Sequence, residues 1–191
     1  MKRGFRDLPV LEHETLYVGF DNSNHAGKRR GEIIVATFSF NVLDAIVKNF
    51  GKNRDYASVE KWINDPVNPR DYRFCSLIDE KYRHIHQNIP HAAPFLVRSF
   101  LDKLKFEVPN VFLYFDGELE KWHENYLRQV FKPCFRNIGI EYFIKKRGIH
   151  NCPMPVYVAD VLSNDLYNGG FSEVAEHPKG VIIKNSISRR E

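Results

Sequence analysis

A short apolar stretch that ends on an acidic residue, Leu16 to Asp21, constrains the fold of this chain more than any other part of its sequence. Leu16 to Phe20 are mostly apolar, as expected of a strand inside a domain. The polar segment that follows, Asp21 to Asn24, is typical of a turn. A second apolar run starts at Glu32 after a short basic link, so we expect the two strands to form an antiparallel hairpin.

Length and composition indicate a globular chain with a sizeable core. The chain has 191 residues, of which 43% are hydrophobic and 14% aromatic, and this composition excludes an intrinsically disordered protein. The sequence has no apolar run of the length that a membrane helix needs, and the charged N-terminus lacks the apolar segment of a secretory signal. We therefore expect one cytoplasmic domain over residues 1–191, with a loosely held arm at 1–13 and a polar tail at 185–191.

The rest of the chain alternates between predicted helices and strands. Beyond the hairpin, the expected strands are Tyr72 to Ile78, Val111 to Phe115, Ile138 to Ile144 and Gly180 to Lys184. The expected helices are Asn41 to Phe50, Ser58 to Ile63, Ala93 to Leu104, Glu118 to Phe131, and one that starts near Pro155 and ends before Gly169. Three strands followed by alternating helices and strands predict an α/β fold with a mixed sheet and helices packed against it.

Two of these helices carry a prediction about which face is buried. In the helix expected at 41–50, the residues predicted to share one apolar face are Val42, Leu43, Ile46 and Val47. In the helix expected at 118–131, the residues predicted to point inward are Leu119, Trp122, Tyr126 and Val130.

Three aspartates stand at corresponding places in this pattern. Asp21 ends the first strand, Asp116 follows the strand Val111 to Phe115, and Asp160 lies in the second turn of the last helix. Such an aspartate either caps a turn or holds a cation. Mg²⁺ prefers hard oxygen ligands, and a pair of ions about 3.5–4 Å apart can clamp the attacking and leaving oxygens of a phosphodiester. Three converging carboxylates would repel one another without a cation, so their convergence would indicate a metal site.

The element order and the local sequences around these aspartates resemble the ribonuclease H-like superfamily. The matching pieces are Gly19-Phe20-Asp21, Phe115-Asp116-Gly117 and Val158-Ala159-Asp160, and they are most similar to the type 2 ribonuclease H branch and its uncharacterised relatives. The resemblance covers roughly Thr15 to Tyr167. It implies a ribonuclease H-like mixed sheet, opened by three antiparallel strands, in a divalent-metal-dependent phosphodiesterase that acts on nucleic acid. Its catalytic residues would be Asp21, Asp116 and Asp160, holding Mg²⁺ or Mn²⁺.

Position 22 departs from the pattern of that branch. The type 2 enzymes carry glutamate directly after the first-strand aspartate, whereas this chain has Asn22. Glu118 is a candidate for the missing metal ligand, although an acid there is also favourable in the first turn of a helix. The departure favours an alternative, a non-catalytic ribonuclease H-like domain that binds nucleic acid or a protein partner. Whether the chain is an enzyme is therefore left open, with a nuclease as the function that the resemblance implies.

Two basic segments flank the acidic positions. Lys28, Arg29 and Arg30 follow the first aspartate, and Lys145, Lys146 and Arg147 precede the last. If both loops border the carboxylates, they could contact the phosphates of RNA, DNA or a hybrid; otherwise they are solvated loops. A net charge of +4 is compatible with such a partner. The polar residues that could touch the same backbone, or only satisfy a turn, are Asn22, Ser23 and Asn24.

The cysteines and histidines carry weaker signals. Three widely spaced cysteines argue against a disulfide framework, and they lack the paired spacing of a structural zinc site. A metal-binding role for His150 and Cys152 is conceivable, but ordinary loop positions are favoured for them.

Overall fold

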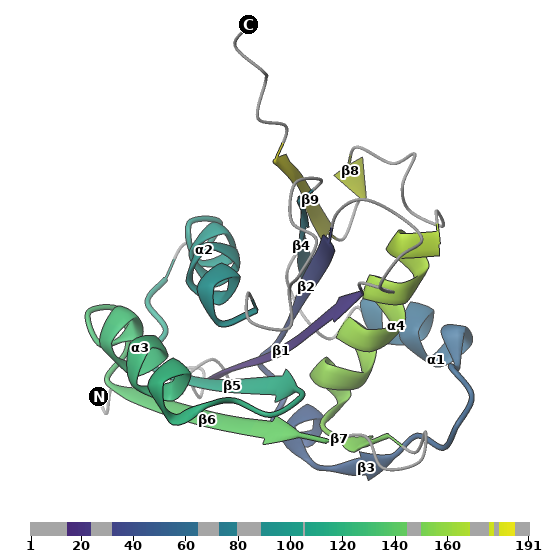
Figure 1. Ribbon diagram of the computed structural model, residues 1–191, viewed down its shortest axis with the longest axis horizontal. Helices are drawn as coiled ribbons and strands as arrows, with labels where there is room; N and C mark the ends of the chain where they lie inside the picture. Colours follow the sequence, from purple (N-terminus) through teal and green to yellow (C-terminus); the bar gives the residue numbers. More distant parts are fainter. Residues whose placement is uncertain are drawn as a thin grey trace, which may run out of the picture.

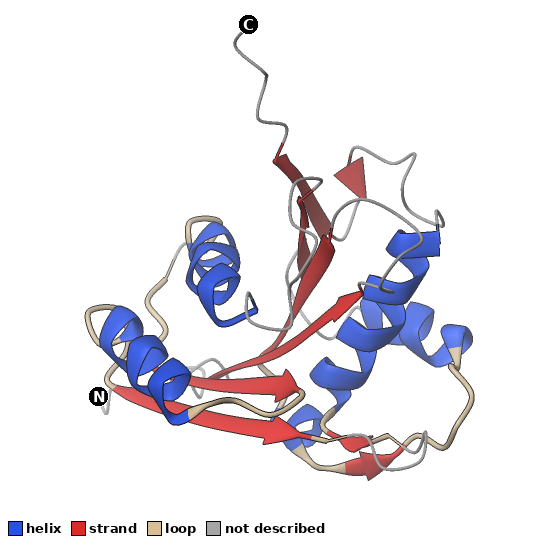
Figure 2. Cartoon of the chain, viewed as in Figure 1, coloured by secondary structure: helices blue, strands red, loops and turns tan. Residues whose placement is uncertain are grey.

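A mixed β-sheet with helices on both faces dominates the computed structural model (Figures 1 and 2). The structure describes residues 15–23, 32–64, 73–79, 89–104, 106–144, 150–168, 176–177 and 180–185. Within these residues, seven strands follow the spatial order β6-β5-β1-β2-β4-β9-β8. Their bounds are β1 (Thr15–Ser23), β2 (Glu32–Ser39), β4 (Phe74–Asp79), β5 (Asn110–Asp116), β6 (Asn137–Phe143), β8 (Glu176–His177) and β9 (Gly180–Asn185). The short strands β3 (Lys48–Asn49) and β7 (Asn151–Cys152) form a separate antiparallel ribbon.

The strand directions place several carboxyl ends at one edge of the sheet. β1 is antiparallel to β2 and β2 is antiparallel to β4, which confirms the three antiparallel opening strands. β5 runs parallel to β1 on its other side, and β6 runs parallel to β5. The carboxyl ends of β1, β4, β5 and β6 therefore point the same way.

Among the described residues, four α-helices cover the two faces of the sheet. α2 (Ile89–Leu101) and α3 (Lys121–Phe131) pack on one face, and α4 (Met154–Asn168) packs on the other with α1 (Tyr56–Ile63) outside it (Figure 1). Alternate residues of β1 pack on opposite faces of the sheet. Phe20 packs in the core under α2 and α3, whereas the residues on either side of it face α4. α4 is buried along nearly its whole length, so it is a core element as well as a carrier of Asp160.

A close backbone contact fixes α4 against β1. A Cβ atom at Gly19 would lie 2.2 Å from the carbonyl carbon of Pro155 and 2.3 Å from the nitrogen of Val156, so only glycine permits this approach. The hydroxyl of Thr37 on β2 donates a hydrogen bond of 2.6 Å to the carbonyl oxygen of Pro155. The first turn of α4 is thereby held by both central strands. The predicted helix start near Pro155 is confirmed.

The helix predicted at 41–50 is wrong. A short 3-10 helix, η1 (Val42–Ala45), is followed by extended backbone at Ile46 and by β3. The apolar residues expected to be buried are more than half exposed, namely Val42, Leu43, Ile46 and Val47. The residue that this segment buries is instead Asp44, which accepts hydrogen bonds from Ser39 and Trp62. A buried polar anchor therefore decides the orientation here, and the apolar periodicity does not.

The inward face predicted for α3 is also wrong in part. Trp122 is 49% exposed and Val130 is 37% exposed, and the buried helical residues are His123, Leu127 and Phe131. Their spacing of four residues is the spacing of one helix face. The helix starts at Lys121 rather than at residue 118, and its buried face is shifted accordingly.

The remaining elements agree with the predicted ones to within a few residues, except that β1 continues through Asp21 to Ser23, where a turn was expected. The predicted arm at 1–13 lies outside the described residues, as does the tail beyond Asn185. None of the described helices is long and apolar enough to span a bilayer.

Candidate metal centre

The three aspartates singled out in the sequence come from three different elements. Asp21 lies near the end of β1, Asp116 is the last residue of β5, and Asp160 lies in the middle of α4. Phe20 of β1 pairs in parallel with Phe115 of β5, so the two following aspartates leave neighbouring strands at the same height. Strand alternation points both toward the face that α4 covers.

These carboxylates form one compact group. One oxygen atom from each of Asp21, Asp116 and Asp160 lies within 4.8 Å of the others. Asp21 is 5% exposed and Asp160 is 3% exposed, whereas Asp116 is half-buried, so the group opens toward solvent on the Asp116 side. Three carboxylates at this spacing repel one another strongly, and a divalent cation would relieve that repulsion. Their hard oxygen donors suit Mg²⁺ or Mn²⁺ and would suit a soft metal poorly.

Ser163 supports the group from the next turn of α4. Its hydroxyl oxygen lies 3.3 Å from Oδ2 of Asp21 and 3.1 Å from the backbone carbonyl oxygen of Asp160. The hydroxyl can donate its proton to either acceptor. Ser163 is 1% exposed, so it joins strand and helix inside the site.

Two basic side chains converge on a single carboxylate oxygen. Nε of Arg54 lies 3.3 Å from Oδ2 of Asp160, and Nδ1 of His150 lies 3.8 Å from the same atom. Arg54 belongs to the segment between β3 and α1, and His150 directly precedes β7. The two segments are tied together by the β3–β7 pairing and by a hydrogen bond of 3.0 Å from the Phe50 amide to the His150 carbonyl. The pairing of β3 with β7 therefore positions Arg54 and His150 next to Asp160 on α4.

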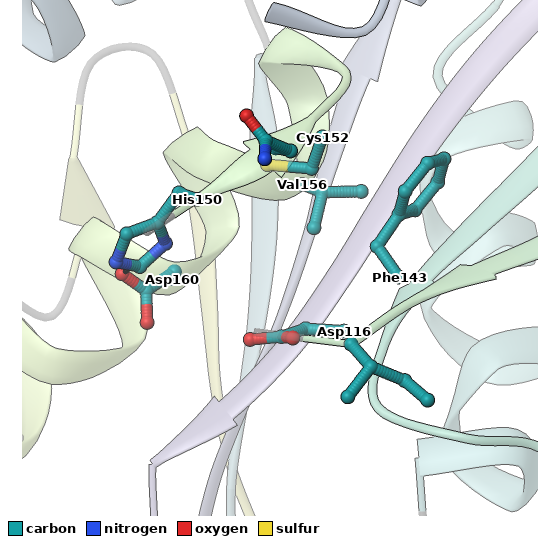
Figure 3. Close-up of a pocket in the computed structure, with 8 residues that line it drawn as sticks. Asp116, Phe143, His150, Cys152, Val156 and Asp160 are labelled. Atoms are coloured by element: carbon teal, nitrogen blue, oxygen red, sulfur yellow. Dashed lines mark ion pairs between the residues drawn. The ribbon is translucent and has the colours of Figure 1, made fainter. Parts of the chain in front are cut away.

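A narrow crevice runs beside the carboxylates. Figure 3 shows Asp116 and Asp160 pointing toward the same space, with the His150 ring next to Asp160. The crevice is polar at one end, and it is apolar where Phe143, Cys152 and Val156 line it. The metal candidate therefore adjoins a surface that could contact the less polar parts of a bound molecule.

The other predicted site residues lie elsewhere. Asn22 is half-buried and pairs with Ile34, whose side chain belongs to the α2–α3 core, so it leaves β1 on the face opposite Asp21. Ser23 is 4% exposed and shares the face of Asp21. Glu118 is exposed in the loop before α3 and is not part of the carboxylate group. The candidates that lie outside the described residues are Asn24, Lys28, Arg29, Arg30, Lys145 and Lys146.

Reasoning from sequence missed Ser163 and Arg54 and favoured an ordinary loop position for His150. Ser163 carried a readable signal, because it stands three residues after Asp160 on the same predicted helix. Arg54 carried none, since its approach, like that of His150, depends on the pairing of β3 with β7. For His150 the sequence favours an ordinary loop position over a metal-binding role, and the structure places its ring beside Asp160 of the carboxylate group.

Comparison with known proteins identifies the fold. The crystal structure of the ribonuclease H2 from Pyrococcus horikoshii OT3 matches with a TM-score of 0.50 and 11% sequence identity, over 84% of this chain and 75% of that one. No protein-family model matches the sequence, and no curated protein matches it. This chain therefore has a ribonuclease H-like fold. The finer resemblance to the type 2 branch rests on the local motifs alone and stays a prediction.

Proposed function

We propose that this chain is a divalent-metal-dependent nuclease, with Asp21, Asp116 and Asp160 as the residues that hold Mg²⁺ or Mn²⁺. The observation that carries the proposal is the meeting of three carboxylate oxygens within 4.8 Å of one another. The ribonuclease H-like fold supports it at the level of class, because a fold by itself does not determine an activity.

Each residue of the centre has a distinct task in this proposal. Bound ions would supply activation of a water nucleophile and stabilisation of the leaving oxygen of a phosphodiester. Asp21 and Asp160 would bind from the buried side, and the Ser163 hydroxyl, 3.3 Å from Oδ2 of Asp21, would help to orient the Asp21 carboxylate. Asp116 is half-buried, so a phosphodiester reaches the centre from its side. Because the three ligands stand on two strands and a helix, packing of the core fixes their spacing.

A nucleic-acid backbone is the proposed substrate, with RNA, DNA and hybrid all as candidates. The basic segments Lys28 to Arg30 and Lys145 to Arg147 are proposed to contact its phosphates. Removing these charges should weaken binding to every sequence and reduce the dependence of affinity on salt. Unchanged affinity would show that the segments are solvated loops.

The proposal is tested by a cleavage screen over single- and double-stranded RNA, DNA and hybrid substrates, with Mg²⁺, Mn²⁺ or a chelator. We expect metal-dependent cleavage that Asp116→Asn abolishes. A matched control is Glu107→Gln, which removes an exposed acid outside the carboxylate group and should leave cleavage unchanged. If no substrate is cleaved while nucleic acid or a protein partner still binds, the non-catalytic alternative replaces the nuclease.

The fourth ligand is tested separately with metal titrations of Asn22→Glu and Glu118→Gln. Tighter binding in Asn22→Glu would mean that position 22 reaches the ions although it leaves β1 on the other face. Weaker binding in Glu118→Gln would assign the role to Glu118, whose exposed loop would then close on the site.

A further inference from the structure

The guanidinium of Arg54 occupies a position that a bound cation would also favour. It lies 3.3 Å from Oδ2 of Asp160, a residue of the proposed metal centre. We propose that Arg54 is a built-in counter-cation, which neutralises part of the carboxylate group when no ion is bound and competes with divalent ions for Asp160. This inference rests on the proposed metal centre and adds to it a residue that sets the metal affinity.

The two partners differ in how easily they can leave the pair. The side chain of Asp160 is 4% exposed, whereas that of Arg54 is 35% exposed. Burial means that Asp160 cannot replace the Arg54 guanidinium by bulk water, and removing a positive charge from beside three neighbouring carboxylates is unfavourable. Arg54 can turn outward and be hydrated at little cost. The contact is therefore suited to exchange for an incoming cation.

The backbone at Arg54 is held in place even though the side chain is partly exposed. The backbone amide of the next residue, Asp55, donates a hydrogen bond of 2.6 Å to the hydroxyl oxygen of Tyr157 on α4. The Tyr157 ring also stacks on Phe50 at a centroid distance of 4.0 Å. A tyrosine phenol is uncharged at neutral pH, and burial raises the pKa of the Tyr157 phenol further. Tyr157 precedes Asp160 by three residues and so lies near it on the same side of α4.

The start of α1 provides a second anchor for the same segment. Asp55 caps that helix by accepting a hydrogen bond of 3.1 Å from the Ser58 amide. Arg54 thus extends from a backbone held on both α1 and α4, and it reaches the carboxylate group whenever no cation displaces it. A charged side chain that only covered the surface would not need this support.

Metal affinity distinguishes a counter-cation from a residue that merely braces Asp160. If Arg54 competes with the ion, Arg54→Gln should bind Mn²⁺ and Mg²⁺ about tenfold more tightly, since a charge beside a carboxylate shifts its equilibria by about one to three powers of ten. If Arg54 only positions Asp160, the same variant should bind ions more weakly. The two roles therefore predict changes of opposite sign.

The experiment is calorimetric titration of the full chain with Mn²⁺ and Mg²⁺, together with thermal unfolding in chelator and in excess metal. We expect Arg54→Gln to unfold at a lower temperature in chelator, to gain more from added metal than the wild type, and to bind ions more tightly. Arg54→Lys should stay close to the wild type because it keeps the charge. The control is Lys52→Gln, which removes one positive charge from the same exposed segment and should change the affinity little.

The outcomes also separate this inference from the nuclease proposal. Equal or weaker ion binding by Arg54→Gln, with binding intact in the wild type, overturns the counter-cation and leaves the metal centre in place. Absence of ion binding in both proteins overturns the two together. Tighter binding by Arg54→Gln in a protein that cleaves no substrate supports the counter-cation while the nuclease proposal fails.

Discussion

Two buried carboxylate sites in this molecule are built in opposite ways. Oδ2 of Asp44 accepts a hydrogen bond of 2.6 Å from the Ser39 hydroxyl and one of 2.8 Å from the Trp62 indole. Arg73 then lies 4.4 Å above the Trp62 ring and donates to its carbonyl oxygen. At the carboxylate group of Asp21, Asp116 and Asp160, by contrast, three acids meet one another within 4.8 Å.

The difference separates an acid that stabilises the fold from acids that prepare a site. Asp44 has neutral donors around it, and its hydrogen bonds tie η1 and α1 to β2. The carboxylate group concentrates negative charge, which destabilises the folded chain unless a cation is present. Buried acids with local donors therefore indicate structure, and buried acids facing one another indicate a ligand.

The largest effect on stability is expected at Asp44. Asp44→Ala leaves the Ser39 hydroxyl and the Trp62 indole without their acceptor, and hydrogen bonds to charged groups contribute about 1.5–3 kcal/mol each. We expect the free energy of unfolding to fall by about 3 kcal/mol in urea denaturation, with metal affinity unchanged. Asp44→Asn should lose less stability than Asp44→Ala, since the amide oxygen can still accept a hydrogen bond. A change below about 1 kcal/mol for Asp44→Ala would remove the distinction drawn between the two sites.

A smaller effect of opposite sign is expected at Asp116. Asp116→Asn removes one of three neighbouring charges, so in chelator the free energy of unfolding should rise by about 1–2 kcal/mol. The stabilisation that added Mn²⁺ gives the wild type should disappear in this variant. Urea denaturation with and without metal measures both terms. Destabilisation in chelator would mean that Asp116, like Asp44, serves the fold.

The smallest effect is expected at His123, a third kind of buried polar group. It is 4% exposed, and neither ring nitrogen has a hydrogen-bond partner among the described residues. Burial lowers the pKa of its imidazole, and nearby His91 lowers it further, against an opposing effect of Glu120. The folded chain therefore favours the neutral ring, so stability should fall as the pH drops below about 6.5.

His123→Leu should flatten that pH dependence between about pH 7 and 5 and raise stability at pH 7 by about 1 kcal/mol. Urea denaturation at several pH values measures it. His91→Leu on the exposed side of α2 is the control and should leave most of the slope in place. An unchanged slope in His123→Leu would show that another group titrates.

The sequence was sufficient to place the carboxylate group because strand ends are readable. An apolar run followed by an aspartate marks both strands, although it marks the strand end only at β5, since β1 continues past Asp21 to Ser23. A helix with Asp160 on it completes the set once the parallel neighbours are known. The prediction at 41–50 failed because Val42, Leu43, Ile46 and Val47 have helical spacing, yet Asp44 is the residue with buried partners.

Whether a segment is a helix or a strand was easier to predict than which of its residues are buried and which residues reach the site. At α3 the apolar Trp122 was expected inside and is half exposed, while the polar His123 takes the buried position. The approach of Arg54 and His150 to Asp160 could not be predicted, because two-residue strands far apart in the sequence have to pair before either side chain reaches it. Short pairings of this kind have too little pattern to be read from one chain.

The contact of Gly19 with Pro155 and Val156 makes the distance between carboxylates a property of backbone atoms. Asp21 lies two residues beyond Gly19 on one element, and Asp160 lies five residues beyond Pro155 on the other. The contact therefore fixes the distance between the strand segment that carries Asp21 and the helix segment that carries Asp160. A single methyl group at position 19 would push β1 and α4 apart without altering any charge or any metal ligand. The spacing of the carboxylates thus depends on a glycine, which has no side chain that could itself bind a metal ion.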